Sequence, residues 1–270
     1  MLPSEKKALP IPLAFIWRKI HSLMGLGLTI FLFFHLYTNS QAAFWIGDDG
    51  KSYIQSVNSI QEIPYLRIFE LLVLAVPLAI HGIFGIYYLK TGLGNAYLNS
   101  GKDPYLPEYE RNRAYTWQRI TSWLLLVGIL FHVAHMRFIE APFPSTEGTY
   151  LVSLTMDDGL NALASRLKVP LQKEPSGLVI ARASDFGTAE LLMVRETFKS
   201  PIMMFLYTIF VLAACFHAFN GLWTFSITWG ISLSERTQSL FLRFTTFLMF
   251  LTTFLGLSTI YLTYYVNLRG

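Results

Sequence analysis

The sequence predicts an all-α membrane protein with five transmembrane helices. Of its 270 residues, 53% are hydrophobic and 14% are charged, whereas soluble domains carry roughly 25% charged residues. Five apolar runs have about the length that a helix needs to cross a bilayer. These runs cover residues 17–37, 66–89, 120–136, 201–229 and 241–266.

Three further features of the sequence exclude other classes of protein. The first run follows about sixteen polar or mixed residues and has no small-residue cleavage site after it, so it indicates a retained helix rather than a signal peptide. The net charge of +4 reflects which side the loops face, and no nucleic-acid partner is expected. Cys215 is the one cysteine, so the chain forms no internal disulfide and holds no iron–sulfur cluster alone.

The distribution of Lys and Arg predicts the orientation of the chain. Basic residues collect before the first run and between the second and third runs, and few occur between the first and second. The cationic side of a membrane protein is cytoplasmic, so we expect a cytoplasmic N-terminus and an external C-terminus. The residues on the cytoplasmic side include Lys6, Lys7, Arg18, Lys19, Lys90, Lys102, Arg111, Arg113 and Arg119.

The connection between the third and fourth runs, residues 140–199, is expected to be a long external loop. A structureless connection of this length is uncommon in a compact protein. Its segments GLNALASRLKV (159–169) and TAELLMVRETF (188–198) have helical spacing of apolar residues. We therefore expect a small external cap with short helices, inserted into a single transmembrane domain that covers residues 1–270.

Four histidines lie inside the apolar runs, one on each of the first four. They are His35, His81, His132 and His217. Histidine is costly in a bilayer and usually faces the interior of the bundle with a partner; a hydrogen bond to a neighbouring helix is the simpler explanation for any one of them. With a rise of about 1.5 Å per residue, His35 and His132 share an outer level. His81 and His217 share an inner level, roughly 14 Å away in depth.

Two levels with two histidines each match the axial ligands of two stacked b-type haems. Neutral imidazoles from facing helices can fill both axial positions of each iron. A zinc or copper site would instead gather its ligands at one level. Helices one to four are therefore predicted to form a haem-binding bundle. His135 is a rival to His132, because it follows three residues later, about 60° around the helix; depth favours His132, and His135 could instead bond a propionate, a quinone or water.

Other polar residues in or beside the runs are candidates for supporting roles. Arg18, His21 and Arg119 could neutralise haem propionates at the cytoplasmic end; Lys19 is better explained as a positive-inside anchor. Glu70 precedes His81 by eleven residues, close to three helical turns, and could carry protons for quinone chemistry. The alternative is an interfacial carboxylate paired with Arg67 one turn away.

Six short segments match one family pattern. They are RKIHS (18–22), FHLYTN (34–39), PLAIHGIFGIY (77–87), WQRITSW (117–123), FHVAHMRF (131–138) and FHAFNGLWTFSITWGI (216–231). Together they resemble the dihaem cytochrome b membrane anchor of bacterial succinate:quinone oxidoreductases, in the single-anchor type found with menaquinone-linked succinate dehydrogenases. The last segment is the most specific, and the long 140–199 connection departs from the family.

The resemblance implies a set of roles and partners. His35 and His132 would ligate the distal haem b and His81 and His217 the proximal one, while position 135 is not a ligand. Flavoprotein and iron–sulfur subunits would dock on the cytoplasmic face of a bacterial inner membrane. Electrons from succinate would pass through them to the haems and then to quinone, expected to be menaquinone. The chain would not itself contain the succinate site.

Two other functions fit parts of the sequence. The cytochrome b of a hydrogenase or formate dehydrogenase also has histidines on several helices, but it typically places two ligands on one helix. A transporter with proton-relaying histidines would be expected to show broken helices or paired repeats. The sequence shows neither of these features.

Overall fold

The computed structural model describes residues 11–92 and 108–269. Within them, five helical spans are long and apolar enough to cross a membrane, which confirms the five predicted spans. Lys6, Lys7 and Lys102, on which the predicted orientation partly depends, lie outside the described residues. The spans are formed by α1 (Leu13–Phe44), α3–η1–α4 (Leu66–Glu70, Leu71–Ala75, Val76–Thr91), α5–η2 (Glu110–Ala134, His135–Ile139), α8 (Pro201–Thr228) and α9–η3 (Glu235–Leu262, Thr263–Leu268).

The starts of the last two spans are marked by local sequence. Ser200 caps α8 by accepting a hydrogen bond from the backbone N–H of Met203, and Pro201 occupies the first turn, where its missing N–H costs nothing. At α9, Ser234 and Thr237 form a capping box. Each of these two helices therefore begins at a serine cap.

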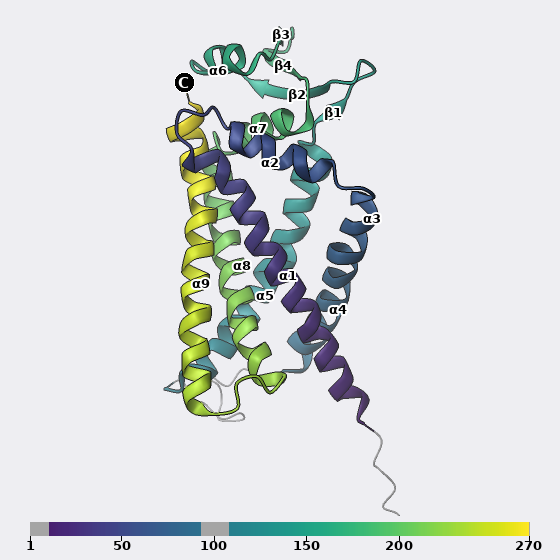
Figure 1. Ribbon diagram of the computed structural model, residues 1–270, viewed down its shortest axis with the longest axis vertical. Coiled ribbons are helices and arrows are strands. Elements are labelled where there is room, and N and C mark those ends of the chain that lie inside the picture. The colour runs from purple at the N-terminus through teal and green to yellow at the C-terminus, as the bar shows by residue number, and fades with distance from the viewer. Residues whose placement is uncertain (1–10, 93–107, 270) are drawn as a thin grey trace, which may run out of the picture.

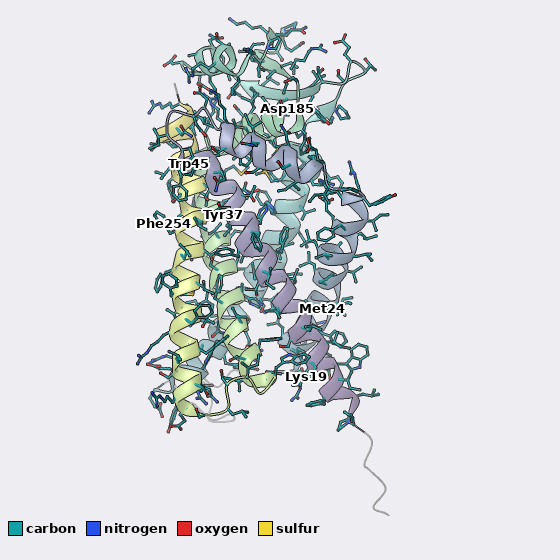
Figure 2. All side chains as sticks on the ribbon, viewed as in Figure 1. Lys19, Met24, Tyr37, Trp45, Asp185 and Phe254 are labelled. Carbon is teal, nitrogen blue, oxygen red and sulfur yellow. The ribbon has the colours of Figure 1, made fainter. Side chains whose placement is uncertain are left out.

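The spans form a bundle with a folded cap at one end (Figure 1). Helix α1 crosses the bundle diagonally and packs against α4, α8 and α9, while α5 packs against α8. The α3–η1–α4 span lies at the edge, and none of the residues in its most apolar window is buried. Figure 2 marks the two ends of the molecule: Lys19 lies near the amino end, where the described chain starts, and Asp185 lies at the cap end.

The cap, residues 140–199, corrects the prediction of an all-α protein with an external loop. Both predicted helices are present, as α6 (Leu160–Leu167) and α7 (Phe186–Thr197). The cap also contains an antiparallel sheet that was not predicted, with strand order β1-β2-β4-β3. The strands are β1 (Phe143–Pro144), β2 (Tyr150–Thr155), β3 (Leu171–Lys173) and β4 (Leu178–Ala183). A further helix, α2 (Lys51–Gln61), packs against α7.

A buried arginine fastens the cap to the end of the last span. The side chain of Arg195 is fully buried; its Nε donates to the Leu268 carbonyl at 2.7 Å, and its two Nη atoms donate to the Asp157 carboxylate at 2.8 and 2.7 Å. Lys199 adds a second cation 2.8 Å from Asp157. Burial by itself would raise the pKa of Asp157, but the hydrogen bonds and charges of Arg195 and Lys199 outweigh it and hold this pKa well below its usual range.

Two asparagines make further polar connections between the cap, α2 and the spans. The Asn58 side chain on α2 donates to Asp185 at 2.8 Å and accepts from the Gly187 backbone N–H at 2.7 Å, so it binds the start of α7. Asn267 donates to the Ala42 carbonyl at 2.7 Å, which joins the end of the last span to that of α1. The cap end is therefore held by buried hydrogen bonds as well as by apolar packing.

Replacing Arg195 by methionine should loosen the cap. Removing one partner of a buried ion pair costs about 3–5 kcal/mol, because the other charge is left uncompensated. We expect α7 amides in the full-length, detergent-solubilised Arg195→Met chain to exchange hydrogen for deuterium much faster than in the wild type. Arg182→Met is the matched control: its pair with Glu147 is exposed and should be worth less than about 1 kcal/mol. Equal exchange in the two variants would contradict the anchoring role of Arg195.

Candidate functional site

The histidines of the outer level face each other across the bundle. The rings of His35 on α1 and His132 on α5 have centroids 5.9 Å apart and are inclined by 74°. Both residues lie in the halves of their helices nearer the cap. The structure thus brings together two imidazoles from separate helices, with a gap between them too wide for a direct hydrogen bond.

The histidines of the inner level repeat this arrangement nearer the amino end. The rings of His81 on α4 and His217 on α8 have centroids 6.1 Å apart and are inclined by 84°. Two metal–nitrogen bonds of about 2 Å, plus about 1 Å from each nitrogen to its ring centre, give a separation of about 6 Å. Each gap therefore has the width that one metal ion between two imidazoles requires.

The described part of the chain contains no group of three or more His, Cys, Asp or Glu side chains placed to hold a metal ion. Two facing imidazoles instead suit a metal that brings its other ligands with it, as the iron of a porphyrin does. The α3–η1–α4 span, which supplies His81, lies at the edge of the bundle and has no buried residue in its most apolar window.

The inner imidazoles are oriented by hydrogen bonds at Nδ1. His81 Nδ1 lies 3.0 Å from the His21 carbonyl, which can only accept, so Nδ1 carries the proton. His217 Nδ1 lies 3.4 Å from the hydroxyls of Thr121 and Ser122. Both hydroxyls donate to backbone carbonyls of α5, so they accept from His217 Nδ1. Nε2 of a neutral imidazole is then unprotonated, which is the form that binds a metal.

A side-chain brace fixes the backbone around His217. Gln118 on α5 donates to the His217 carbonyl at 3.1 Å and accepts a 2.7 Å hydrogen bond from Asn220, one turn further along α8. Gln118 had no predicted role. It occurs in the WQRITSW segment, but only the packing of α5 against α8 shows which residue it contacts.

The outer imidazoles have different surroundings. His132 Nδ1 lies 3.3 Å from the hydroxyl of Tyr207 on α8. The His35 ring stacks on Phe31 with centroids 5.4 Å apart, and it has no hydrogen bond to any described residue. His135, the rival to His132, is buried in η2, where its Nδ1 also lies 3.3 Å from the Tyr207 hydroxyl. The histidine ring that contacts His35 is His132.

The predicted propionate-binding residues divide into two groups. The His21 ring stacks on His81 with centroids 4.0 Å apart, and its Nδ1 is buried without a hydrogen-bond partner among the described residues. Arg119 donates from Nη2 to the Leu89 carbonyl at 2.9 Å, while its buried Nη1 likewise has no partner in the described chain. Unpaired buried nitrogens call for a ligand or water. His21 lies beside the inner pair, whereas Arg119 contacts α4 about two turns beyond His81.

The other two cations at this end are placed differently. Arg18 is exposed. Lys19 donates to the Thr228 carbonyl and lies over the Trp229 ring, 4.7 Å from its centroid, so it joins α1 to the end of α8. Its environment agrees with an anchoring role rather than with contact to the inner pair.

Glu70 pairs with a different arginine from the one considered above. Its Oε2 lies 3.3 Å from Arg137 Nη2, at the cap end of the third span, and both side chains are more than a third exposed. The spacing between Glu70 and His81 no longer predicts a shared face, because it crosses η1 (Leu71–Ala75), where π-type i→i+5 bonding adds a residue to the turn.

Arg137 also acts on a second carboxyl group, on the cap. Burial raises the pKa of Glu190 on α7 from its ordinary value of 4.5 to about 7, and the charge of Arg137 limits this rise. Arg137 therefore lies within electrostatic reach of a carboxylate at the edge of the bundle and of another beneath the cap. In the sequence it marked only the outer end of the third apolar run.

The fold and the paired imidazoles define a class: a multi-pass helical membrane protein with two histidine pairs between its helices. The chain is similar to the succinate dehydrogenase cytochrome b558 subunit of Bacillus subtilis (strain 168). The two are 24% identical over 248 residues, which cover 92% of this chain and 96% of that relative. No family model matches the chain, and no solved structure matches it.

Gly25 leaves the room that the His81 ring occupies. A Cβ atom at this position would come within 2.9 Å of His81 Cε1, whereas one at Gly27 would meet nothing within 4 Å. We therefore expect Gly25→Ala to displace the ring and, on the proposal made below that His81 is a haem ligand, to lower the haem content by up to one haem per chain. Gly27→Ala is the matched control and should change nothing. The reduced-minus-oxidised haem b spectrum per chain measures both, and equal spectra would contradict the role of Gly25.

Proposed function

We propose that the chain is the membrane anchor and electron-transfer subunit of a succinate:quinone oxidoreductase. It would pass electrons from an iron–sulfur subunit through two b haems to menaquinone. The observation that carries the proposal is the presence of two facing imidazole pairs, 5.9 and 6.1 Å apart. They occur in a chain that aligns over 92% of its length with a succinate dehydrogenase cytochrome b558 subunit.

The residues have separate tasks in this proposal. His35 and His132 hold the outer haem, and His81 and His217 hold the inner one. A bound haem iron supplies reversible one-electron transfer, with a potential that its ligands and their hydrogen bonds tune. The protein orients the inner ligands through the His21 carbonyl and the hydroxyls on α5. The unpaired nitrogens of His21 and Arg119 are suited to carboxylates such as haem propionates. Arg18 is a weaker candidate, because it is exposed.

The two ends of the bundle have different partners in this proposal. Flavoprotein and iron–sulfur subunits dock on the cytoplasmic amino end, which carries basic residues and is nearer the inner pair. Quinone binds nearer the cap end, outside the outer pair. The described chain starts at one end of the bundle and finishes at the other (Figure 1), as an odd number of crossings requires. Opposite ends fit opposite sides of the membrane, and the basic residues of the amino end favour a cytoplasmic N-terminus and an external C-terminus in a bacterial inner membrane.

Quinone reduction also needs protons, and Glu70 is the proposed donor. Its carboxylate lies at the cap end of the second span, where the contact with Arg137 holds it beside the third span. A side chain that is partly exposed can exchange protons with water and hand them to a reduced quinone. The arginine keeps the carboxylate oriented between these transfers.

The haem-to-protein ratio of the purified full-length chain tests the proposal directly, and we expect a value near two. In His217→Ala the ratio should fall to about one, because the inner pair loses a ligand while the outer pair is intact. His135→Ala is the control and should keep both haems. A purified chain without a haem b spectrum would refute the proposal, and loss of a haem in His135→Ala but not in His132→Ala would reassign the outer ligand.

The role of Glu70 can be tested separately from the haems. Glu70→Gln keeps the shape of the side chain but cannot exchange a proton, so we expect quinone reduction by the intact complex to slow by about 100-fold, the lower range for general acid–base groups. Haem content should not change. Glu62→Gln, at an exposed position at the end of α2, is the control. Normal turnover in Glu70→Gln would leave this carboxylate with a structural role only.

A further inference from the structure

Tyr207 joins two histidines that the proposed function treats separately. This tyrosine of α8 is 5% exposed, and its hydroxyl lies 3.3 Å from Nδ1 of His132 and 3.3 Å from Nδ1 of His135. The phenol ring is packed edge-on against Phe198, with centroids 5.5 Å apart, and against Phe210, at 6.2 Å. Because the ring is enclosed, the hydroxyl is held between the two imidazoles.

The donors and acceptors in this group have one consistent arrangement, which rests on the proposed role of His132 as a haem ligand. A neutral imidazole that binds iron through Nε2 carries its proton on Nδ1. His132 then donates to the Tyr207 oxygen. The Tyr207 hydroxyl still has its own proton and donates it to His135 Nδ1. His135 in turn keeps its proton on Nε2.

We propose that Tyr207 is a positioning residue of the outer haem site and that His135 acts on this site only through Tyr207. The hydrogen-bonded chain His132–Tyr207–His135 fixes the rotation of the His132 ring and makes its Nε2 a stronger electron donor. An acceptor at the second nitrogen of a ligand histidine raises the basicity of that ligand. A more basic ligand favours the oxidised iron and so lowers the reduction potential.

The effect of Tyr207 on the reduction potential should be confined to the outer of the two haem sites. At the inner pair, His81 donates to a backbone carbonyl and His217 to hydroxyls of α5, and neither contact involves Tyr207. At the outer pair, His35 has no hydrogen bond to its ring among the described residues. Among the described residues, the hydrogen bond to a ring of the outer pair is therefore the one between His132 and Tyr207.

His135 strengthens the hold of Tyr207 on His132 without touching the ligand. Hydrogen bonds in a chain polarise one another, so a hydroxyl that donates to an imidazole is a better acceptor through its oxygen. His135 is 7% exposed, and its ring stacks on Phe131 with centroids 5.4 Å apart. It is thus a buried, oriented acceptor, which explains a second histidine three residues from a ligand in the same span.

Redox titration and electron paramagnetic resonance of the full-length chain in isolated membranes test this inference. In Tyr207→Phe we expect the potential of one haem to rise and the low-spin ferric signal of that haem to move. The other haem and the haem-to-chain ratio should stay unchanged. Tyr261→Phe is the matched control: its hydroxyl bonds Thr208, the residue next to Tyr207, at 2.8 Å and contacts no histidine in the described chain. Two unmoved potentials in a Tyr207→Phe chain that binds two haems would overturn the inference.

A double-mutant cycle tests whether His135 acts through Tyr207. His135→Leu should raise the same potential by less than Tyr207→Phe does, and Tyr207→Phe combined with His135→Leu should match Tyr207→Phe alone. If the two shifts in potential were additive, His135 would act independently of Tyr207, which would contradict the proposed order His132–Tyr207–His135. If the Tyr207→Phe protein does not accumulate, the His135→Leu variant alone tests the inference. An unchanged haem potential in His135→Leu would then refute it. A wild-type chain without haem would instead refute the proposed function.

Discussion

The constraint on which the rest of the structure depends is that an imidazole inside a bilayer is costly unless neighbouring groups hold it. In the bundle, one nitrogen of three of the four paired histidines is used by a carbonyl or a hydroxyl of a neighbouring residue. The rings of the two pairs lie with their centroids 5.9 and 6.1 Å apart. The histidine pairs thus link α1 with α5 and α4 with α8, while α9, which carries no histidine, is held by its packing against α1 and α8.

The same constraint accounts for residues that helix packing alone would not select. Gly25 allows the His81 ring to approach the backbone of α1. Gln118 and Asn220 hold the backbone of α8 where His217 leaves it. At the edge, the α3–η1–α4 span contributes His81 while burying none of the residues in its most apolar window. This span is held by its packing against α1, which includes the stacking of His81 on His21 and of Phe84 on Trp17.

Much of the fold could be predicted from the sequence, because depth and length in a membrane are set by the helical rise. The five spans follow from the lengths of the apolar runs, and the two pairs of neighbouring rings are those that the depth estimate groups together. Their role as ligands stays a prediction. Rotation about a helix is harder to predict than depth, since one π-helical turn between Glu70 and His81 is enough to change the face.

Contacts between distant segments were also beyond the sequence. The roles of Arg137 and Tyr207 depend on which residues of other helices face them. The sheet of the cap was missed because its strands are short; β4 alternates buried and partly exposed residues, but it pairs with β2, more than twenty residues earlier. Only two helical segments of the cap had a periodic pattern long enough to recognise.

The position of the cap gives the outer pair a mechanical connection that the inner pair lacks. At the end of α7, Phe198 packs edge-on against Tyr207, and Thr197 contacts Met136 beside His135. Arg195, one turn earlier on α7, fixes this helix to the last span through Leu268. The fully buried guanidinium thus orients the residue that encloses Tyr207. In the described structure, the surroundings of the inner pair are supplied by the spans themselves, whereas the outer pair is enclosed in part by a cap fastened through a buried charge.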